Sequence, residues 1–119
     1  MQIGRVAERT GLSLHTLRHY DDVDLLRPSA RSEGGFRLYT EDDVARLMVV
    51  RRMKPLGFTL EQMRELLEVT GALADASGAQ EAALRARLAE FVRLAEEARS
   101  RMLERVAMAE ELLGQLRSR

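Results

Sequence analysis

The chain has 119 residues, a length that suits one compact domain with an extended arm. Its 19 basic and 19 acidic side chains cancel, so net charge indicates no particular partner. The absence of cysteine excludes disulfides, thiolate metal sites and cysteine nucleophiles. No apolar run reaches the ~18 residues of a membrane span, and the N-terminus lacks a signal-peptide core, so we expect a cytoplasmic protein.

Two short helices are predicted within residues 3–22. Apolar residues recur at helical spacing from Ile3, and Gly11 stands where a left-handed residue would end the first helix. Ser13 is a favourable N-cap for a second helix over residues 14–22. This is the spacing of a helix-turn-helix, whose second helix enters the major groove of DNA. The groove-facing side would carry hydrogen-bond donors, namely His15, Thr16, Arg18 and His19.

A small β-hairpin is predicted at residues 27–39. Proline, serine and glycine residues supply the turn, and after them apolar and polar side chains alternate in the tetrad Phe36-Arg37-Leu38-Tyr39. The alternation places Phe36 and Leu38 on one face of the strand and Arg37 and Tyr39 on the other.

Two helices are predicted after the hairpin, and capping residues mark the start of each. Thr40 stands before three acidic residues, which favour the positive end of a helix dipole, and Pro55 breaks this helix. Thr59 and Gln62 form a capping box for the next helix. The Gly- and Ala-rich residues 71–79 are expected to form a hinge.

One long helix is predicted from residue 80 to residue 117. Its apolar residues recur at spacings of three and four, the pattern of a coiled-coil seam, with one extra four-residue step between Ala98 and Val106. Such a helix extends roughly 55 Å and cannot bury its seam within so small a domain, so a second copy of the chain is the simplest partner. The expected dimer contacts are Leu84, Leu88, Phe91, Ala95, Met102, Val106, Ala109, Leu113 and Leu116.

Three stretches of the sequence carry a family resemblance: IGRVAERTGLSLHTLRHYDDVDLLRP, GGFRLYTEDDVARLMVVRRM and LGFTLEQMRELL. In this order and spacing they closely resemble the MerR family of bacterial transcription regulators. The resemblance implies a mainly α fold, with a winged helix-turn-helix DNA-binding domain over residues 1–70 and an antiparallel coiled-coil dimerisation helix over residues 80–117. The hairpin is then the first wing and residues 41–69 form a second, helical wing. Family members bind promoter inverted repeats as homodimers and distort the DNA so that RNA polymerase can engage it.

The same resemblance assigns roles to individual residues. Arg18 and Tyr20 fall at the family's recognition-helix contacts, and Arg37 and Tyr39 fall at the phosphate contacts of its wing. A tyrosine can pack its ring in the core while its hydroxyl reaches phosphate, so we expect both functions of the two tyrosines.

Three positions depart from the family pattern. His19 stands where a second tyrosine is usual, which replaces one aromatic contact with a smaller, titratable side chain. Asp24 occupies a usual glycine position and is expected to keep the left-handed turn. Pro55 is expected to end or kink the third helix early.

Several alternatives stay open at this stage. The basic cluster of Arg51, Arg52 and Lys54 either contacts DNA or only solvates a helix end; we include Arg52 and Lys54 among the candidate DNA contacts. His15 and His19 make an incomplete zinc site, so neither a metal nor a cofactor is expected. No enzyme motif is present.

The alternative function is a protein-interaction module that uses the winged fold and the coiled coil without specific DNA binding. Family members usually carry an effector domain after the long helix, whereas few residues follow Leu116 here. The sequence leaves open the inducing signal, the operator and the sign of regulation.

Overall fold

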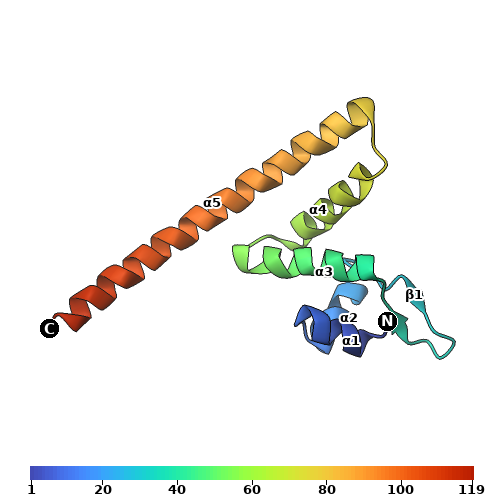
Figure 1. The fold of residues 1–119 in the computed structure, drawn as a ribbon, viewed down its shortest axis with the longest axis horizontal. Coiled ribbons are helices and arrows are strands. Elements are labelled where there is room, and N and C mark those ends of the chain that lie inside the picture. The colour runs from blue at the N-terminus through green and yellow to red at the C-terminus, as the bar shows by residue number, and fades with distance from the viewer. The chain divides into compact units, whose positions relative to one another are not determined.

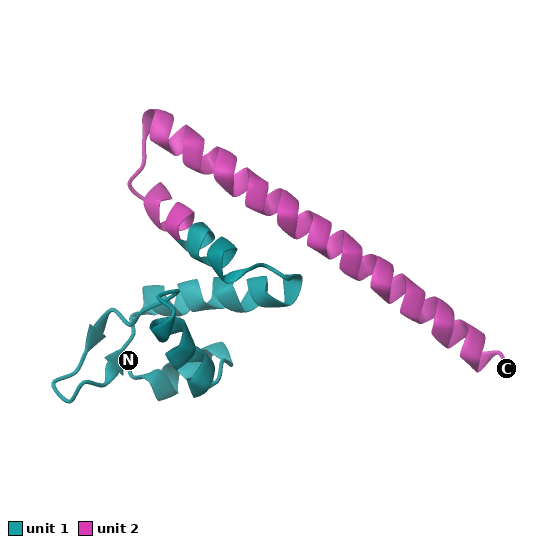
Figure 2. Cartoon of the chain, turned by 180° about the vertical axis from the view of Figure 1, so that it is seen from behind, with its two compact units in different colours: residues 1–67 teal, residues 68–119 magenta.

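The chain forms six helical segments and one two-stranded hairpin in the computed structural model, which describes residues 1–119. In chain order the elements are α1 (Ile3–Thr10), α2 (Leu14–Asp22), β1 (Ala30–Arg31), β2 (Arg37–Leu38), α3 (Glu41–Met53), the 3-10 helix η1 (Lys54–Leu56), α4 (Leu60–Leu73) and α5 (Gly78–Arg117) (Figure 1). They divide into one unit of residues 1–67 and another of residues 68–119 (Figure 2). The mainly helical fold class with a hairpin and a long C-terminal helix is confirmed.

The core of the first unit lies where α1 packs against α2 and α3. The side chains of Val6, Leu17, Leu47 and Val50 are at most 1% exposed. Burial of each such side chain stabilises the fold by about 1.5–3 kcal/mol relative to exposure. This core holds one side of α2 and leaves its other side to solvent.

The residues that end α1 and cap α2 are the ones predicted from the sequence. Gly11 ends α1 in the left-handed conformation, with φ +74°, and its N–H donates to the carbonyl of Ala7. Ser13 caps α2, since its Oγ accepts from the backbone N–H of Thr16 at 3.0 Å. Short-range chemistry therefore sets where the second helix begins.

Gly11→Ala is expected to lower the free energy of unfolding by about 1–2 kcal/mol, because an L side chain is strained in this conformation. The added Cβ would also lie 3.3 Å from Nη2 of Arg51. Gly4→Ala is the matched control, since a Cβ there meets nothing within 4 Å and alanine favours a helix. Urea unfolding of the three proteins measures the difference. Equal stability of Gly11→Ala and wild type would contradict the strain argument.

The hairpin is short and antiparallel, with Ala30 opposite Leu38 and Arg31 opposite Arg37. A further bridge joins Leu38 to Gln2, and the chain start thus extends the hairpin at its β2 edge. This pairing was not predicted, because residues so far apart in sequence leave no local pattern that connects them.

Capping boxes start both helices that follow the hairpin; the box at α4 was predicted, and at α3 only the capping role of Thr40 was. At α3, Thr40 Oγ1 accepts from the N–H of Asp43 at 3.1 Å, and Asp43 Oδ2 accepts from the N–H of Thr40 at 3.0 Å. The same carboxylate oxygen accepts from the hydroxyl of Ser29 at 2.6 Å, which ties the start of the hairpin segment to α3. At α4, Thr59 and Gln62 make the equivalent pair of hydrogen bonds at 2.9 and 3.1 Å.

The ends of α3 and α4 differ in how well they were predicted. α3 ends at Met53 and passes into η1, which contains Pro55, so the early end is confirmed. The predicted hinge at 71–79 was too long, because α4 continues to Leu73 and α5 begins at Gly78. Alanine and leucine favour helix over hinge, and they outweigh the single Gly71.

α5 is one continuous helix of 40 residues. It agrees with the predicted long helix to within two residues at its start. No helix in the structure combines the length and the apolar character needed to cross a membrane.

Candidate nucleic-acid interface

The solvent-facing side of α2 carries most of the predicted donors. His15, Arg18 and His19 are exposed, while Leu17 and Tyr20 on the other side are buried. Arg18 pairs with no acidic side chain of the chain, so all its N–H donors are available. This arrangement suits hydrogen bonding to base edges in a major groove.

Thr16 is less available than its three neighbours. It is half-buried, and its hydroxyl accepts a hydrogen bond from Ser13 Oγ at 2.9 Å. In this structure the Thr16 hydroxyl therefore takes part in the N-cap of α2.

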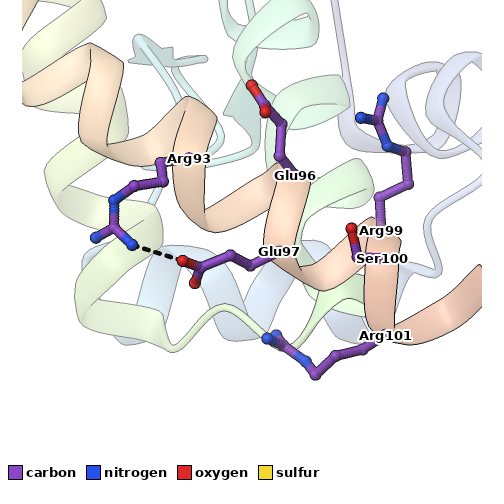
Figure 3. A pocket seen from close by; sticks show the side chains of 6 residues that line it. All are labelled: Arg93, Glu96, Glu97, Arg99, Ser100 and Arg101. Atoms are coloured by element: carbon purple, nitrogen blue, oxygen red, sulfur yellow. Dashed lines mark hydrogen bonds and ion pairs between the residues drawn. The ribbon is translucent and has the colours of Figure 1, made fainter. Parts of the chain in front are cut away.

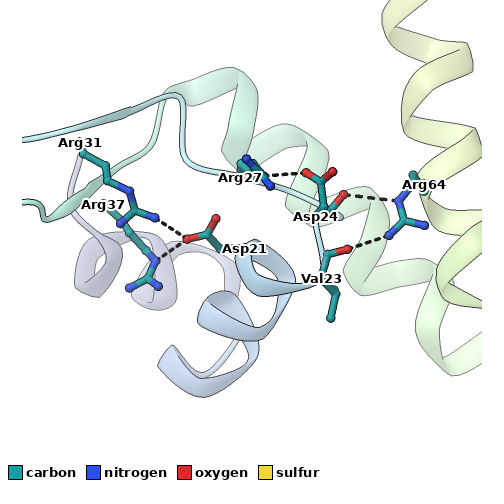
Figure 4. A network of polar contacts seen from close by, with 7 residues as sticks. All are labelled: Asp21, Val23, Asp24, Arg27, Arg31, Arg37 and Arg64. Carbon is teal, nitrogen blue, oxygen red and sulfur yellow. Dashed lines mark hydrogen bonds and ion pairs between the residues drawn. The ribbon is translucent and has the colours of Figure 1, made fainter.

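An ion-pair cluster joins the first wing to the end of α2 (Figure 4). Asp21 Oδ2 accepts from Nη2 of Arg31 at 2.7 Å and from Nε of Arg37 at 2.8 Å. Burial raises the pKa of the Asp21 carboxyl, but the hydrogen bonds from Arg37 and Arg31 outweigh it, so this pKa lies below its ordinary value. Arg37, predicted as a phosphate contact, is thus already held by one partner. Sequence reasoning missed Asp21 and Arg31 here.

The two tyrosines lie in the core, which corrects the expectation that their hydroxyls reach phosphate. Tyr20 is 4% exposed and Tyr39 is 2% exposed. Both hydroxyl oxygens are buried without a hydrogen-bond partner, and burial raises the pKa of both phenols. Each ring is packed in the core as far as its hydroxyl. The predicted packing role is therefore seen, and the predicted phosphate contact is not.

The end of α3 presents the predicted basic cluster. Arg51, Arg52 and Lys54 are exposed. Arg51 reaches the turn of the helix-turn-helix, since a Cβ on Gly11 would lie 3.3 Å from its Nη2. The structure thus places Arg51 beside the helix-turn-helix formed by α1 and α2. The spacing of residues in the sequence did not indicate this proximity.

Nowhere in the structure do three or more His, Cys, Asp or Glu side chains cluster as they would to hold a metal ion. His15 and His19 lie one turn apart on α2, and no third ligand joins them.

The second unit presents an apolar stripe on α5. The stripe runs over Met102, Val106, Ala109, Leu113 and Leu116, and Val106, Leu113 and Leu116 are 53%, 44% and 57% exposed. A shallow hollow lies along it, lined by Met102, Arg105, Val106 and Ala109. Of the earlier seam residues, Phe91 is buried, and Leu84, Leu88 and Ala95 are half-buried.

A second hollow on α5 has a different character (Figure 3). It is lined by Arg93, Glu96, Glu97, Arg99, Ser100 and Arg101. Arg93 bonds to Glu97 at 2.6 Å, one turn away on the same helix, and to Glu90 at 2.8 Å. Alternating charges paired at these spacings are typical of a solvated helix face.

Two sequence models of protein families match the chain. One, described as "MerR HTH family regulatory protein", matches residues 1–70. The other, described as "MerR, DNA binding", matches residues 44–116.

Individual relatives agree with these matches. The transcriptional regulator CueR of Yersinia pestis is 32% identical over 114 residues, which cover 96% of this chain and 82% of CueR. The transcriptional activator mta of Bacillus subtilis is 43% identical over 67 residues, which cover 56% of this chain and 26% of the activator. The matched region covers between 34% and 51% of the length of several other curated relatives.

Solved structures show the same fold. HiNmlR, described as a MerR family regulator lacking the sensor domain and bound to promoter DNA, has a TM-score of 0.73 and 25% identity, with 97% of this chain and 86% of HiNmlR covered. MtaN, the N-terminal part of the Bacillus subtilis multidrug transporter activator, has a TM-score of 0.54 and 32% identity, with 95% and 97% covered.

Proposed function

The chain belongs to the MerR family of transcription regulators, and from this premise we propose that it acts as a homodimer that binds an inverted repeat in promoter DNA. The observation that carries the proposal is the free, exposed Arg18 between His15 and His19 on the solvent face of α2. The promoter DNA bound to the similar HiNmlR supports it.

In the proposed complex, the two kinds of contact come from different elements. α2 reads base edges, chiefly through Arg18, because a guanidinium can bond to two acceptors of a guanine at once. Arg37 on the wing and Arg52 and Lys54 at the end of α3 contact phosphate and set the register of the protein on the duplex. The chain has no net charge, so the placement of these cations matters more than their number.

The proposed dimer forms through the apolar stripe on α5. Val106, Leu113 and Leu116 expose apolar surface along one line of the helix, and a matching helix of a second chain would remove that surface from water. Two copies related by a two-fold axis then match the symmetry of an inverted repeat.

The proposed outcome is control of transcription. Distortion of the promoter by the dimer would let RNA polymerase engage it, as in the family that the chain belongs to. A regulator of this kind acts in the bacterial cytoplasm, where promoter DNA lies. The alternative of a protein-interaction module without specific DNA binding is less well supported, because the relatives described above are regulators of transcription.

Selection of bound duplexes from random DNA tests the proposal. We expect an inverted repeat to be enriched, and binding to it to weaken steeply with salt, because each neutralised phosphate releases counterions. Titration against a scrambled duplex of equal length is the control. Equal affinity for the selected and scrambled duplexes would defeat the proposal.

A further inference from the structure

The residue that links the recognition helix to the first wing is Asp21, in the last turn of α2. Its side chain is 9% exposed, and one of its oxygens accepts hydrogen bonds from both Arg31 and Arg37 (Figure 4). Asp21 lies three residues after Arg18 on the same helix. The cluster therefore connects the base-reading helix with the two wing cations.

The wing depends on this carboxylate for a physical reason. Arg31 and Arg37 are directly opposite each other on the two strands, and like charges in such a pair destabilise a hairpin. Both side chains reach the same atom of Asp21, so they share one face of the wing. One anion between two cations offsets the repulsion and leaves the cluster with a net charge of plus one, which attracts a phosphate.

The way Asp21 holds Arg37 leaves the useful donors free. Arg37 uses Nε for Asp21, and its two terminal nitrogens make no hydrogen bond within the chain. That terminal edge of a guanidinium can bind two phosphate oxygens side by side. The Arg37 side chain is 23% exposed, and a phosphate bound at this edge would not have to displace Asp21, which holds Nε.

The anchor itself is held from a second direction. Arg64 of α4 donates from Nη2 to the carbonyl of Val23 at 2.7 Å and from Nε to the carbonyl of Asp24 at 3.4 Å. Asp24 has φ +59°, the left-handed conformation expected for this position. The turn just after Asp21 is thereby fixed to the second wing, which restricts the movement of Asp21.

We infer that Asp21 is a positioning residue for DNA recognition: it holds Arg37 and Arg31 at a set place relative to Arg18, so that the wing meets phosphate in register with the base contacts. The inference rests on the proposed DNA-binding function. According to this inference the Asp21 carboxylate strengthens operator binding, although its negative charge repels phosphate at long range. A carboxylate that acted only through its charge would have the opposite effect, which makes the two roles separable.

Asp21→Asn tests the inference, because it keeps the size of the side chain and removes its charge. The full chain is titrated with the selected inverted repeat and with a scrambled duplex at several salt concentrations. We expect operator affinity to fall on the order of tenfold and the salt slope to decrease, since a phosphate contact is lost. Affinity for scrambled DNA should stay equal or rise, because loosely held arginines still attract phosphate. Asp21→Glu, which keeps the charge, should restore part of the operator affinity.

A double variant separates positioning from a purely structural role. In an Arg37→Ala background, Asp21→Asn should cause little further loss of operator affinity, because the arginine that Asp21 positions is already absent. An equal loss in that background, or an equal loss for both duplexes, would show that Asp21 only stabilises the fold. Unchanged or tighter operator binding by Asp21→Asn would show that its charge only repels DNA. Either result overturns the inference.

A second variant covers the case in which Asp21→Asn does not fold. Arg37→Lys keeps the positive charge, but a lysine has a single ammonium group. It cannot donate to Asp21 from one nitrogen while two other nitrogens bind two phosphate oxygens side by side. It should lose operator affinity and keep affinity for scrambled DNA, and full operator affinity would count against the inference. If wild type itself does not distinguish the two duplexes, the proposed function fails instead.

Discussion

Arg18→Ala is expected to weaken operator binding by about 1–3 kcal/mol, the range for loss of a good base contact, or roughly five- to 150-fold in dissociation constant. Arg18 is exposed and unpaired on the solvent side of α2, so its removal leaves no buried partner unsatisfied. The thermal stability of the protein should therefore change little. A binding titration at fixed salt and a thermal melt on the same sample measure both quantities.

The control for Arg18→Ala is Arg85→Ala on α5. Arg85 is also an exposed arginine, paired only with Glu81 on its own helix at 3.1 Å. Its loss should leave operator affinity at the wild-type value. If Arg18→Ala binds as tightly as Arg85→Ala, the solvent face of α2 does not meet the DNA bases.

Leu113→Asp is expected to open the dimer and to weaken operator binding by more than any single DNA-contact variant. Leu113 lies on the apolar stripe of α5 and is 44% exposed. In the proposed dimer a second chain would cover it, and burying an unpaired carboxylate there costs several kcal/mol. A single winged unit then binds one half-site without its tethered second contact. Sedimentation and a binding titration on the same sample measure the two effects.

Met108→Asp provides the matched control for this substitution. Met108 is 69% exposed and, at 3.6 residues per turn, points away from the stripe. The variant should stay dimeric and bind the operator normally. Helical content should be retained in both variants, because neither residue is part of the core of residues 1–67. A Leu113→Asp protein that sediments as a dimer would mean that the stripe is not the dimer contact.

The helices of this protein could be predicted from sequence because their boundaries depend on near neighbours. Ser13, Thr40 and Thr59 each cap a helix through a residue three positions later. Gly11 and Pro55 end helices through their own backbone restrictions. Such signals lie within one turn of the chain, so reading the sequence locates them correctly.

The candidate site could be predicted only where a residue acts alone. Arg18 needs nothing but exposure on the right face of α2, and the helical period predicts that face. Asp21 contacts residues 10 and 16 positions away, and no local pattern connects an aspartate in a helix to arginines in a hairpin. The resemblance to the family drew attention to Arg37 but said nothing of what holds it.

The two tyrosines show a different limit. The helical spacing around Tyr20 places its ring on the apolar side of α2, whereas the alternation around Tyr39 only places that ring on the face opposite Phe36 and Leu38. Whether the hydroxyl at the tip of the ring reaches solvent depends on the depth of the core, and depth is a property of the assembled helices. Both hydroxyls lie within that core.

The exposed stripe of α5 has a consequence for the dose response of the proposed regulator. If only paired chains hold both halves of an operator, then below the dissociation constant of the pair the concentration of competent protein grows with the square of the chain concentration. Halving the supply of chain would then reduce operator occupancy about fourfold in that range, as mass action requires. Val106, Leu113 and Leu116 would thus set how sharply the promoter responds to synthesis and turnover of the protein.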